Sequence, residues 1–212
     1  MLIAWFGIRN GGWLLLLLWP AANCFCIGVS YVVKFPQLFG KRANGLLNPF
    51  STFILLPYLS YLWLVWHALR LTQSENAHDE LDERFTIGRR LLHAEMPSDI
   101  QNVIDLTCEF NEPRKIASQF NYLSFPILDA TAPSSVDLQS FVQKIDSLDG
   151  KSYIHCAQGH GRTGLVMAAI LLNHHPELTV DDAIKKIKSV RPALRCNSEQ
   201  IETLRQIRGI TM

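Results

Sequence analysis

Acidic residues are missing from the first third of this chain. All 19 Asp and Glu residues lie beyond position 71, whereas residues 1–70 contain only five basic residues and two long apolar runs without charge. A charged side chain is costly in the hydrocarbon core of a bilayer, whereas an uncharged apolar run is readily accepted there. The split therefore predicts a membrane region at residues 1–70 and a water-soluble region after it.

The first apolar run, residues 13–33, is long enough to cross a membrane as a helix. At about 1.5 Å per residue it extends roughly 30 Å, the thickness of a bilayer core. Trp13 and Trp19 near one end, and Tyr31 and Lys34 near the other, are residue types that favour the two interfaces. We expect a transmembrane helix here.

Two other interpretations of the first run stay open. A cleaved signal peptide would suit Arg9 and the run of leucines after it, although the apolar stretch continues past any cleavage site at Ala21 and Ala22. A lipoprotein site at Cys24 would need a small residue before the cysteine, where the chain has Asn23.

The second apolar run, residues 50–69, is also free of charge until Arg70. Together the two runs predict a two-helix transmembrane hairpin with both chain ends on one side, and Pro57 is expected to kink the second helix. The alternative is that residues 50–69 form a helix at the membrane interface or one packed against protein. Residues 71–84 are polar and acidic, as expected of a linker.

Residues 85–212 alternate between strand-like and helix-like patterns. This alternation predicts an α/β layered domain, with a central largely parallel sheet flanked by helices and a ligand at the carboxyl ends of the strands. The expected strands are 85–92, 103–108, 121–128 and 152–156, and the expected helices are 113–120, 136–148, 161–172, 179–190 and 198–207.

The segment after the last expected strand has the features of a phosphate-binding loop. Cys156 ends the strand, five residues with two glycines follow, and Arg162 begins a helix. Backbone N–H groups at a helix N-terminus favour an anion, and the same field favours the thiolate of Cys156. Arg162 stays charged, and its planar fork matches two phosphate oxygens. The loop residues expected to bind phosphate are Ala157, Gln158, Gly159, His160 and Gly161.

His155, Cys156, five intervening residues, Arg162 and Thr163 together resemble the signature loop of the cysteine-dependent phosphatases, the protein tyrosine and dual-specificity superfamily. The resemblance covers roughly residues 85–212. It implies a phosphocysteine mechanism without a metal or an organic cofactor, and the sequence shows no His/Cys/Asp spacing typical of a metal site. The alternative is a structural cysteine beside an unrelated arginine.

The same resemblance assigns roles to residues around the loop. His155 would support the loop geometry and a low thiol pKa, and Thr163 would donate a hydrogen bond to the departing thiolate. Asn197 resembles a polar residue of a late Arg-Pro…Asn…Gln segment that braces the loop. In the simpler alternatives, His155 is merely buried and Thr163 only satisfies the helix backbone.

A proton donor must serve the leaving oxygen and then activate water. Asp129 is the candidate because it follows an expected strand in a loop that ends at Pro133, which resembles the acid loop of dual-specificity phosphatases. The alternative is an Asp that only caps a turn. Asp105 is the second candidate, although it lies within an apolar strand.

Three of the five cysteines, Cys108, Cys156 and Cys196, are isolated in the soluble region. Their spacing suits neither a metal site nor a disulfide framework, so a reducing compartment is expected. Oxidation is a possible route to a disulfide between Cys156 and either Cys108 or Cys196, but a buried cysteine that only packs is the more common case.

The resemblance implies a phosphomonoester phosphatase, first of all a protein tyrosine or dual-specificity phosphatase acting on a phosphorylated protein. The apolar runs, which lie outside the resemblance, predict that this enzyme is anchored to a membrane. The alternative is a phospholipid phosphatase for phosphatidylglycerophosphate or a monophosphoinositide, and the second alternative is a non-catalytic phosphate-binding module. Ala157, Gln158 and His160 bring no Lys or Arg to the loop, which favours a single phosphate. The net charge of +1 gives no reason to expect a nucleic acid partner. The basic residues on either side of the apolar runs do not decide the membrane orientation. Because reduced thiols and phosphorylated substrates are found inside cells, we expect the catalytic domain in the cytoplasm.

Overall fold

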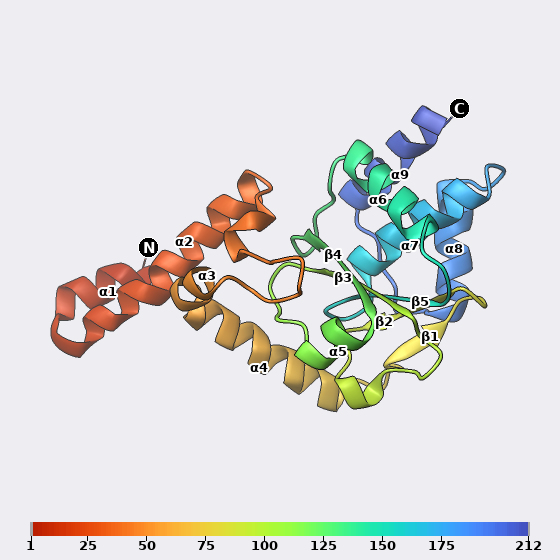
Figure 1. The fold of residues 1–212 in the computed structure, drawn as a ribbon. Coiled ribbons are helices and arrows are strands. Elements are labelled where there is room, and N and C mark those ends of the chain that lie inside the picture. Colours follow the sequence, from red (N-terminus) through yellow and green to blue (C-terminus); the bar gives the residue numbers. More distant parts are fainter. Residues whose placement is uncertain (1, 212) are drawn as a thin grey trace.

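The computed structural model describes residues 2–211 (Figure 1). Its strands are β1 (His78–Glu80), β2 (Phe85–Arg89), β3 (Asn102–Thr107), β4 (Asn121–Ile127) and β5 (Ser152–Cys156). The N-terminal helices are α1 (Leu2–Asn10), η1 (Gly12–Leu17), α2 (Leu18–Val32), η2 (Pro36–Phe39), α3 (Pro49–Ile54) and α4 (Leu56–Thr72), where η marks a 3-10 helix. The other helices are η3 (His93–Glu95), α5 (Arg114–Gln119), α6 (Ser135–Asp146), α7 (Gly161–His174), α8 (Val180–Val190) and α9 (Ser198–Thr211).

The strands form one mixed sheet in the order β1-β2-β5-β3-β4. The strands β2, β5, β3 and β4 run parallel to one another, whereas β1 pairs antiparallel with β2. The prediction of an α/β layered domain with a largely parallel sheet is confirmed. One difference is that β1 lies within residues 71–84, so part of the segment expected as a linker is an edge strand of the domain.

Alternate side chains of the central strands point to two different helix layers. Ile104 and Ile154 pack with α6, α7, α8 and α9, whereas Val103 and Tyr153 pack with Ile116 of α5 on the other face (Figure 1). Helix α7 is buried from Arg162 to Leu172 because β5, α6, α8 and α9 surround it. This burial fixes the start of α7 directly after the loop that follows β5.

One helix among residues 2–211, Gly12–Val32, is long and apolar enough to cross a membrane, and only 11% of its most apolar window is buried. A signal sequence near an N-terminus would have the same length and composition. The second expected span, residues 50–69, is divided at Leu55 into α3 and α4. Pro57 lies in the first turn of α4, where its missing N–H costs no helix hydrogen bond, so it begins a helix instead of kinking one. The structure supports one candidate span and does not confirm a two-helix transmembrane hairpin.

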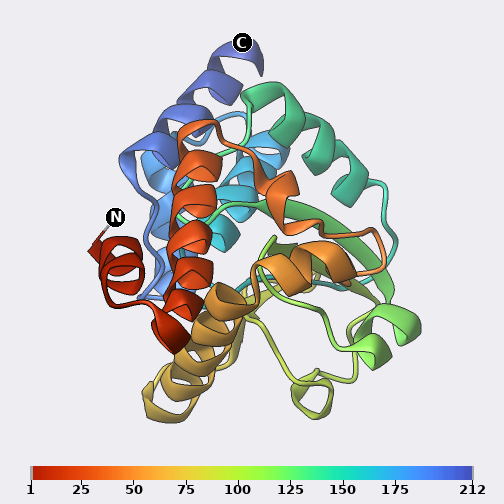
Figure 2. The same ribbon diagram turned by 90° about the vertical axis from the view of Figure 1, so that its left-hand side faces the viewer.

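The N-terminal helices pack against the catalytic domain. Helix α2 contacts α4 near the start of α4, and the two helices run in different directions from that contact (Figure 2). Apolar residues of this region pack with Cys108 and Leu128 beyond the carboxyl ends of β3 and β4. Trp66 of α4 is 2% exposed, and its Nε1 donates a hydrogen bond to the Ala157 carbonyl at 3.1 Å. Lys41, between η2 and α3, is buried with its Nζ 2.7 Å from the Asp105 carboxylate. The apolar region and the catalytic domain therefore share a packed interface.

Candidate active site

Cys156 is the last residue of β5, the central strand of the sheet, and α7 begins five residues later at Gly161. The local sequence folds this way because β5 is wholly buried and the apolar residues after Gly161 pack α7 into the core. Gly159 has a φ of +72°, and a Cβ there would lie 2.3 Å from the backbone of Gly88. The tight turn between Cys156 and α7 therefore requires glycine at this position.

Arg191 braces this loop. Its Nε donates to the Gly159 carbonyl at 2.8 Å and its Nη2 to the Gln158 carbonyl at 3.0 Å, while Nη1 lies 2.6 Å from the Asp79 carboxylate of β1. The bracing role of Arg191 was not predicted. The Arg191-Pro192 pair in the late segment was the available signal.

Arg162 is 1% exposed and forms a two-pronged ion pair with Glu109. Its Nη2 lies 2.7 Å from Oε1 and its Nη1 2.9 Å from Oε2 of Glu109, and Nη1 also donates to the Ile127 carbonyl at 3.0 Å. Burial alone would lower the pKa of Arg162, but Glu109 holds that pKa well above its usual value. Burial alone would raise the pKa of Glu109, but Arg162 lowers it. Both side chains therefore stay charged, and the contribution of Glu109 was not predicted.

The buried Nε of Arg162 has no hydrogen-bond partner among the described residues. An orphaned buried donor is uncommon, because it has lost its bond to water without a replacement. A phosphate oxygen bound at the loop would satisfy it. This is the feature of Arg162 that points to an anion.

Asp129 lies two residues after β4, and its side chain is 70% exposed. Its Oδ1 is 3.2 Å from Nη2 of Arg162, so the structure brings the predicted acid to the predicted phosphate-binding arginine. The second candidate, Asp105, is wholly buried and bonded to Lys41 and Tyr122. Burial would raise the pKa of Asp105, but Lys41 and other neighbours hold it below its usual range. Asp105 is therefore a buried anion and unsuited to donate a proton to a substrate.

Asn197 braces the loop that carries the acid. Its Nδ2 donates to the Ala130 carbonyl at 2.7 Å, and Nε2 of Gln200 donates to the Thr131 carbonyl at 3.1 Å. The late polar segment therefore supports the loop after β4 through Asn197 and Gln200, whereas Arg191 supports the loop after β5.

His155 is wholly buried in β5, with its Nδ1 3.4 Å from the Cys156 carbonyl oxygen. Burial lowers the pKa of His155 to about 4, so the imidazole is neutral at neutral pH. The hydroxyl of Thr163 is buried without a partner among the described residues, which leaves its hydrogen available to a thiolate. The Nε2 atom of His160 lies 2.7 Å from the exposed Glu75 carboxylate, and His160 is not among the residues that line the pocket beside Arg162.

Three buried groups, Asp105, Glu112 and His155, place ligand-type atoms within 4.8 Å of one another. Two cations already lie against them: Lys41 Nζ is 2.7 Å from Asp105, and Arg90 Nε is 3.5 Å from Glu112. Burial and Asp105 raise the pKa of Glu112 to about 8, so this carboxyl is largely protonated at neutral pH. A divalent cation would add charge where positive charge already balances the carboxylates, so the donor set does not fit a metal.

The two other cysteines of the soluble region are thiols. Burial, with Glu109 beside it, raises the pKa of Cys108 well above its usual value, and burial raises the pKa of Cys196 to about 11. Cys108 lines the active-site pocket, and Cys196 lies against Gly164 of α7. A redox role for either residue stays a prediction.

A pocket of about 180 Å³ opens over the loop and has two unlike sides. Its polar side consists of Glu109, Asp129, Ala157, Gln158 and Arg162. Its other side is apolar and aromatic and comes mainly from α2 and α4, with Tyr31, Tyr58, Leu62, Val65, Trp66 and Leu69. This apolar side was not predicted, because these helices lie far from the loop in sequence, with 91 positions between Trp66 and Ala157.

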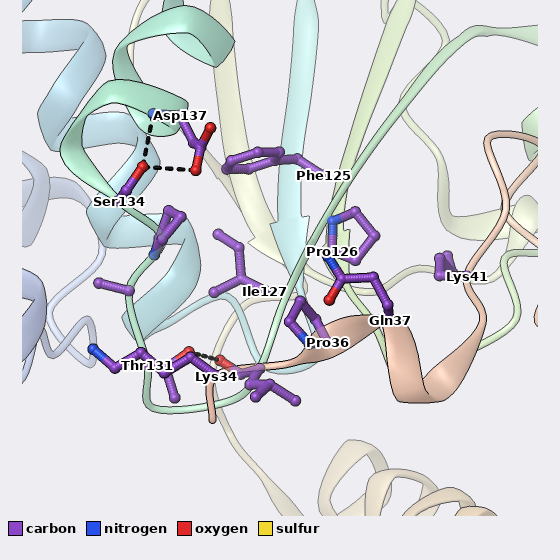
Figure 3. Close-up of a pocket in the computed structure, with 13 residues that line it drawn as sticks. Lys34, Pro36, Gln37, Lys41, Phe125, Pro126, Ile127, Thr131, Ser134 and Asp137 are labelled. Carbon is purple, nitrogen blue, oxygen red and sulfur yellow. Dashed lines mark hydrogen bonds between the residues drawn. The ribbon is translucent and has the colours of Figure 1, made fainter. Parts of the chain in front are cut away.

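A larger cavity, of about 410 Å³, lies between residues 34–41, residues 125–128 and the loop 131–137 (Figure 3). Lys34 and Gln37 approach it from the N-terminal segment, and Ser134 and Asp137 from the start of α6. None of Cys156, Arg162 and Asp129 lines it. Arg162 and Asp129 line the smaller pocket, and buried Cys156 directly precedes Ala157, which also lines it.

Comparison with known proteins agrees with this geometry. The profile of the dual specificity phosphatase catalytic domain matches residues 92–209. A putative tyrosine phosphatase 197R of Invertebrate iridescent virus 6 is 36% identical over 107 residues, which cover 44% of this chain and 40% of the viral protein. The phosphatidylglycerophosphate phosphatase PTPMT2 of Arabidopsis thaliana is 27% identical over 134 residues, 58% of each chain. The matched region thus spans about half the length of these relatives.

Solved structures show the same fold. The active form of Tk-PTP is 25% identical with a TM-score of 0.54, covering 63% of this chain and 97% of that one. PTPMT1 in complex with PI(5)P is 20% identical with a TM-score of 0.57, covering 64% and 96%. The profile match covers more than half of the sequence and includes the loop from Cys156 to Arg162. The chain therefore belongs to the dual specificity phosphatase catalytic domain family.

Proposed function

We propose that this chain is a phosphomonoester phosphatase that works through a phosphocysteine intermediate. The proposal rests on one observation: Nη2 of Arg162 lies 3.2 Å from Oδ1 of Asp129, beside the loop that begins at Cys156. A module that only bound phosphate would gain nothing from an exposed carboxylate beside its arginine, because like charges repel. A catalyst needs such a group to move protons.

The proposed reaction has two steps. The Cys156 thiolate attacks phosphorus, a phosphorus–sulfur bond forms, and the ester P–O bond breaks while protonated Asp129 gives its proton to the leaving oxygen. Asp129 then takes a proton from water, whose oxygen attacks phosphorus and breaks the phosphorus–sulfur bond. Inorganic phosphate leaves, Arg162 holds the phosphoryl oxygens throughout, and Thr163 donates to the returning thiolate.

The proposed substrate carries one phosphate. Arg162 is the only cation among the described residues that line the pocket, and Glu109 and Asp129 beside it would oppose further negative charge. A phosphorylated protein is the substrate that the sequence resemblance implied first. The apolar side of the pocket supports the lipid alternative.

Residues 2–71 are proposed to hold the enzyme at a membrane. Apart from Val136, every exposed large apolar side chain of the described residues lies between Leu2 and Leu71. Apolar surface of this extent on a monomer is the mark of an interaction site. The helix Gly12–Val32 is the segment proposed to enter the bilayer, with the catalytic domain on the cytoplasmic side, where its thiol stays reduced.

Turnover of a small aryl phosphate by the full-length, reduced protein in detergent tests the proposed activity. We expect phosphate release that Cys156→Ser abolishes, because serine at this position keeps the loop but is a far poorer nucleophile. A folded, reduced wild-type protein that released no phosphate from the aryl ester would contradict the proposal.

A further inference from the structure

The apolar side of the pocket, formed by Tyr31 of α2 and by Tyr58, Leu62, Val65, Trp66 and Leu69 of α4, is called the wall below. We infer that this wall makes the pocket a site for a membrane lipid that ends in a single phosphomonoester. The inference rests on the proposed phosphatase function and names its substrate class. In this arrangement the phosphate binds at the loop after Cys156, and the acyl chains leave the pocket along the apolar surface of the two helices.

The wall is a fixed part of the site. Trp66 of α4 donates to the carbonyl of Ala157, the first loop residue after Cys156, at 3.1 Å. The guanidinium of Arg90 lies over the Trp66 ring, 5.1 Å from its centre, and the backbone N–H of Arg90 donates to the same Ala157 carbonyl. A helix bonded to the catalytic loop in this way bounds the substrate path.

The pocket is amphipathic in the same sense as a lipid phosphate. Arg162 and Asp129 lie on one side, and half-buried Leu62 and Val65 of α4 lie on the other. Its volume of about 180 Å³ is below the roughly 300–1,000 Å³ of pockets that enclose whole drug-sized ligands. The pocket therefore accommodates a headgroup, and the chains must continue outside it.

The surface next to the pocket is apolar as well. Phe25 and Val29 of α2 and Tyr61 and Trp63 of α4 are exposed on the helices that form the wall. Exposing such a surface to water costs free energy, whereas covering it with acyl chains is favourable. A lipid in the same bilayer can thus reach the pocket without leaving its apolar surroundings.

The wall also disfavours a phosphoprotein. A phosphorylated side chain brings its polypeptide backbone to the mouth of the pocket, and backbone amides and carbonyls there need hydrogen-bonding partners. On the α2 and α4 side the lining residues offer mainly aliphatic and aromatic groups. The one exposed carboxylate at the mouth, Asp129, is committed to proton transfer.

Three substrates given to the full-length protein in phosphatidylcholine vesicles test the inference. They are phosphatidic acid as the lipid with one phosphate, glycerol 3-phosphate as the same headgroup without chains, and a phosphotyrosine peptide, with a small aryl phosphate as the reference for the chemistry. We expect kcat/KM to be highest for the lipid and to fall as its acyl chains are shortened. A peptide turned over as well as the lipid, or a rate independent of chain length, would overturn the inference.

A matched pair of variants locates the effect. Val65→Gln places a polar group in the apolar wall, and Val136→Gln makes the same change on α6, where Val136 is exposed and remote from the pocket. We expect Val65→Gln to lower the lipid-to-aryl ratio of kcat/KM about tenfold and Val136→Gln to leave the ratio unchanged. An unchanged ratio in Val65→Gln would refute the inferred wall.

The chain-length series needs no variant and so decides the matter even where Val65→Gln fails to fold. Loss of the lipid preference with normal aryl phosphate turnover contradicts the substrate class alone. Absence of aryl phosphate turnover in folded, reduced protein contradicts the proposed phosphatase activity itself.

Discussion

In the absence of substrate, one edge of the Arg162 guanidinium is already hydrogen-bonded. Both Nη groups donate to the Glu109 carboxylate, and Nη1 also donates to the Ile127 carbonyl. The buried Nε has no partner among the described residues. Glu109 therefore orients the guanidinium and leaves one edge for phosphate. The remaining contact of Nη2 with Asp129 must be released before the carboxyl group can reach a leaving oxygen.

The role of Asp129 gives a prediction that depends on the leaving group. Asp129→Asn cannot donate a proton, so kcat for phenyl phosphate should fall by about 100-fold or more. The loss for p-nitrophenyl phosphate should be smaller, because nitrophenolate departs with little protonation. Asp149→Asn, at an exposed acid outside the pocket, is the control and should leave both rates unchanged. Equal losses for the two esters would contradict the assignment of Asp129 as the acid.

The buried imidazole of His155 should make the stability of the protein depend on pH. Burial lowers the pKa of His155 from 6.5 to about 4. Between these two pH values the unfolded chain binds a proton on His155 and the folded chain does not. Stability therefore falls as pH drops through this window, by about 3 kcal/mol in all. Urea unfolding of the full chain at pH 7 and pH 4.5 measures this loss of stability. The free energy of unfolding should fall less between the two pH values in His155→Gln than in the wild type, because glutamine does not titrate. An identical acid dependence in both proteins would show that His155 is not the group responsible.

At the scale of elements, the N-terminal region and the catalytic domain are joined by a buried ion pair. The side chains of Lys41 and Asp105 are 1% and 0% exposed, and the Lys41 ammonium also contacts Thr107 and the Phe110 carbonyl. Phe110 and Glu109 belong to the same loop after β3. The loop that holds the Arg162 partner is thus fixed in part by a residue from the apolar region.

Lys41→Met should destabilise the protein by about 3–5 kcal/mol, because it leaves Asp105 buried and unpaired. The double variant Lys41→Met with Asp105→Asn should recover part of this loss, since it removes the uncompensated charge as well. Denaturant unfolding of the wild type, the two single variants Lys41→Met and Asp105→Asn, and the double variant measures the coupling energy between the two side chains. Strictly additive losses would show that the two side chains do not depend on each other.

Local patterns predicted what local interactions determine. The strand end at Cys156, the tight turn and the start of α7 at Gly161 are set by neighbouring residues, so they could be read along the chain. The partners of Arg162 and Ala157 could not, because Glu109 and Trp66 lie 53 and 91 positions away in sequence. A sequence shows that an arginine needs a partner but not which carboxylate the fold will bring to it.

The apolar run 50–69 shows the same limit for a whole element. Its composition predicted a bilayer span, with a helix at the membrane interface or packed on protein as the alternative. The structure shows α4 packed on the catalytic loop through Trp66, with the ion pair of Arg70 and Glu95 (2.9 Å) fixing its end. These contacts show that α4 packs on protein, and the periodicity of the run could not have predicted them.

For the whole molecule, we expect attachment to membranes by apolar contact. The net charge of +1 provides little attraction to an anionic surface, whereas the exposed apolar side chains of residues 2–71 are numerous. The full-length protein should float with phosphatidylcholine vesicles in a density gradient and remain bound in 1 M salt, because salt screens charges and does not weaken apolar burial. Release by salt alone would contradict attachment through these helices.

The central claim is that phosphate passes through the sulfur of Cys156. Acid quenching of the full-length protein during turnover of p-nitrophenyl phosphate, followed by mass spectrometry of the peptide that contains Cys156, tests it most directly. We expect a phosphate on Cys156, in larger amount in Asp129→Asn because the water of the second step then lacks its base. Steady phosphate release by the wild-type protein with Cys156 never phosphorylated, or undiminished release by Cys156→Ser, would contradict it.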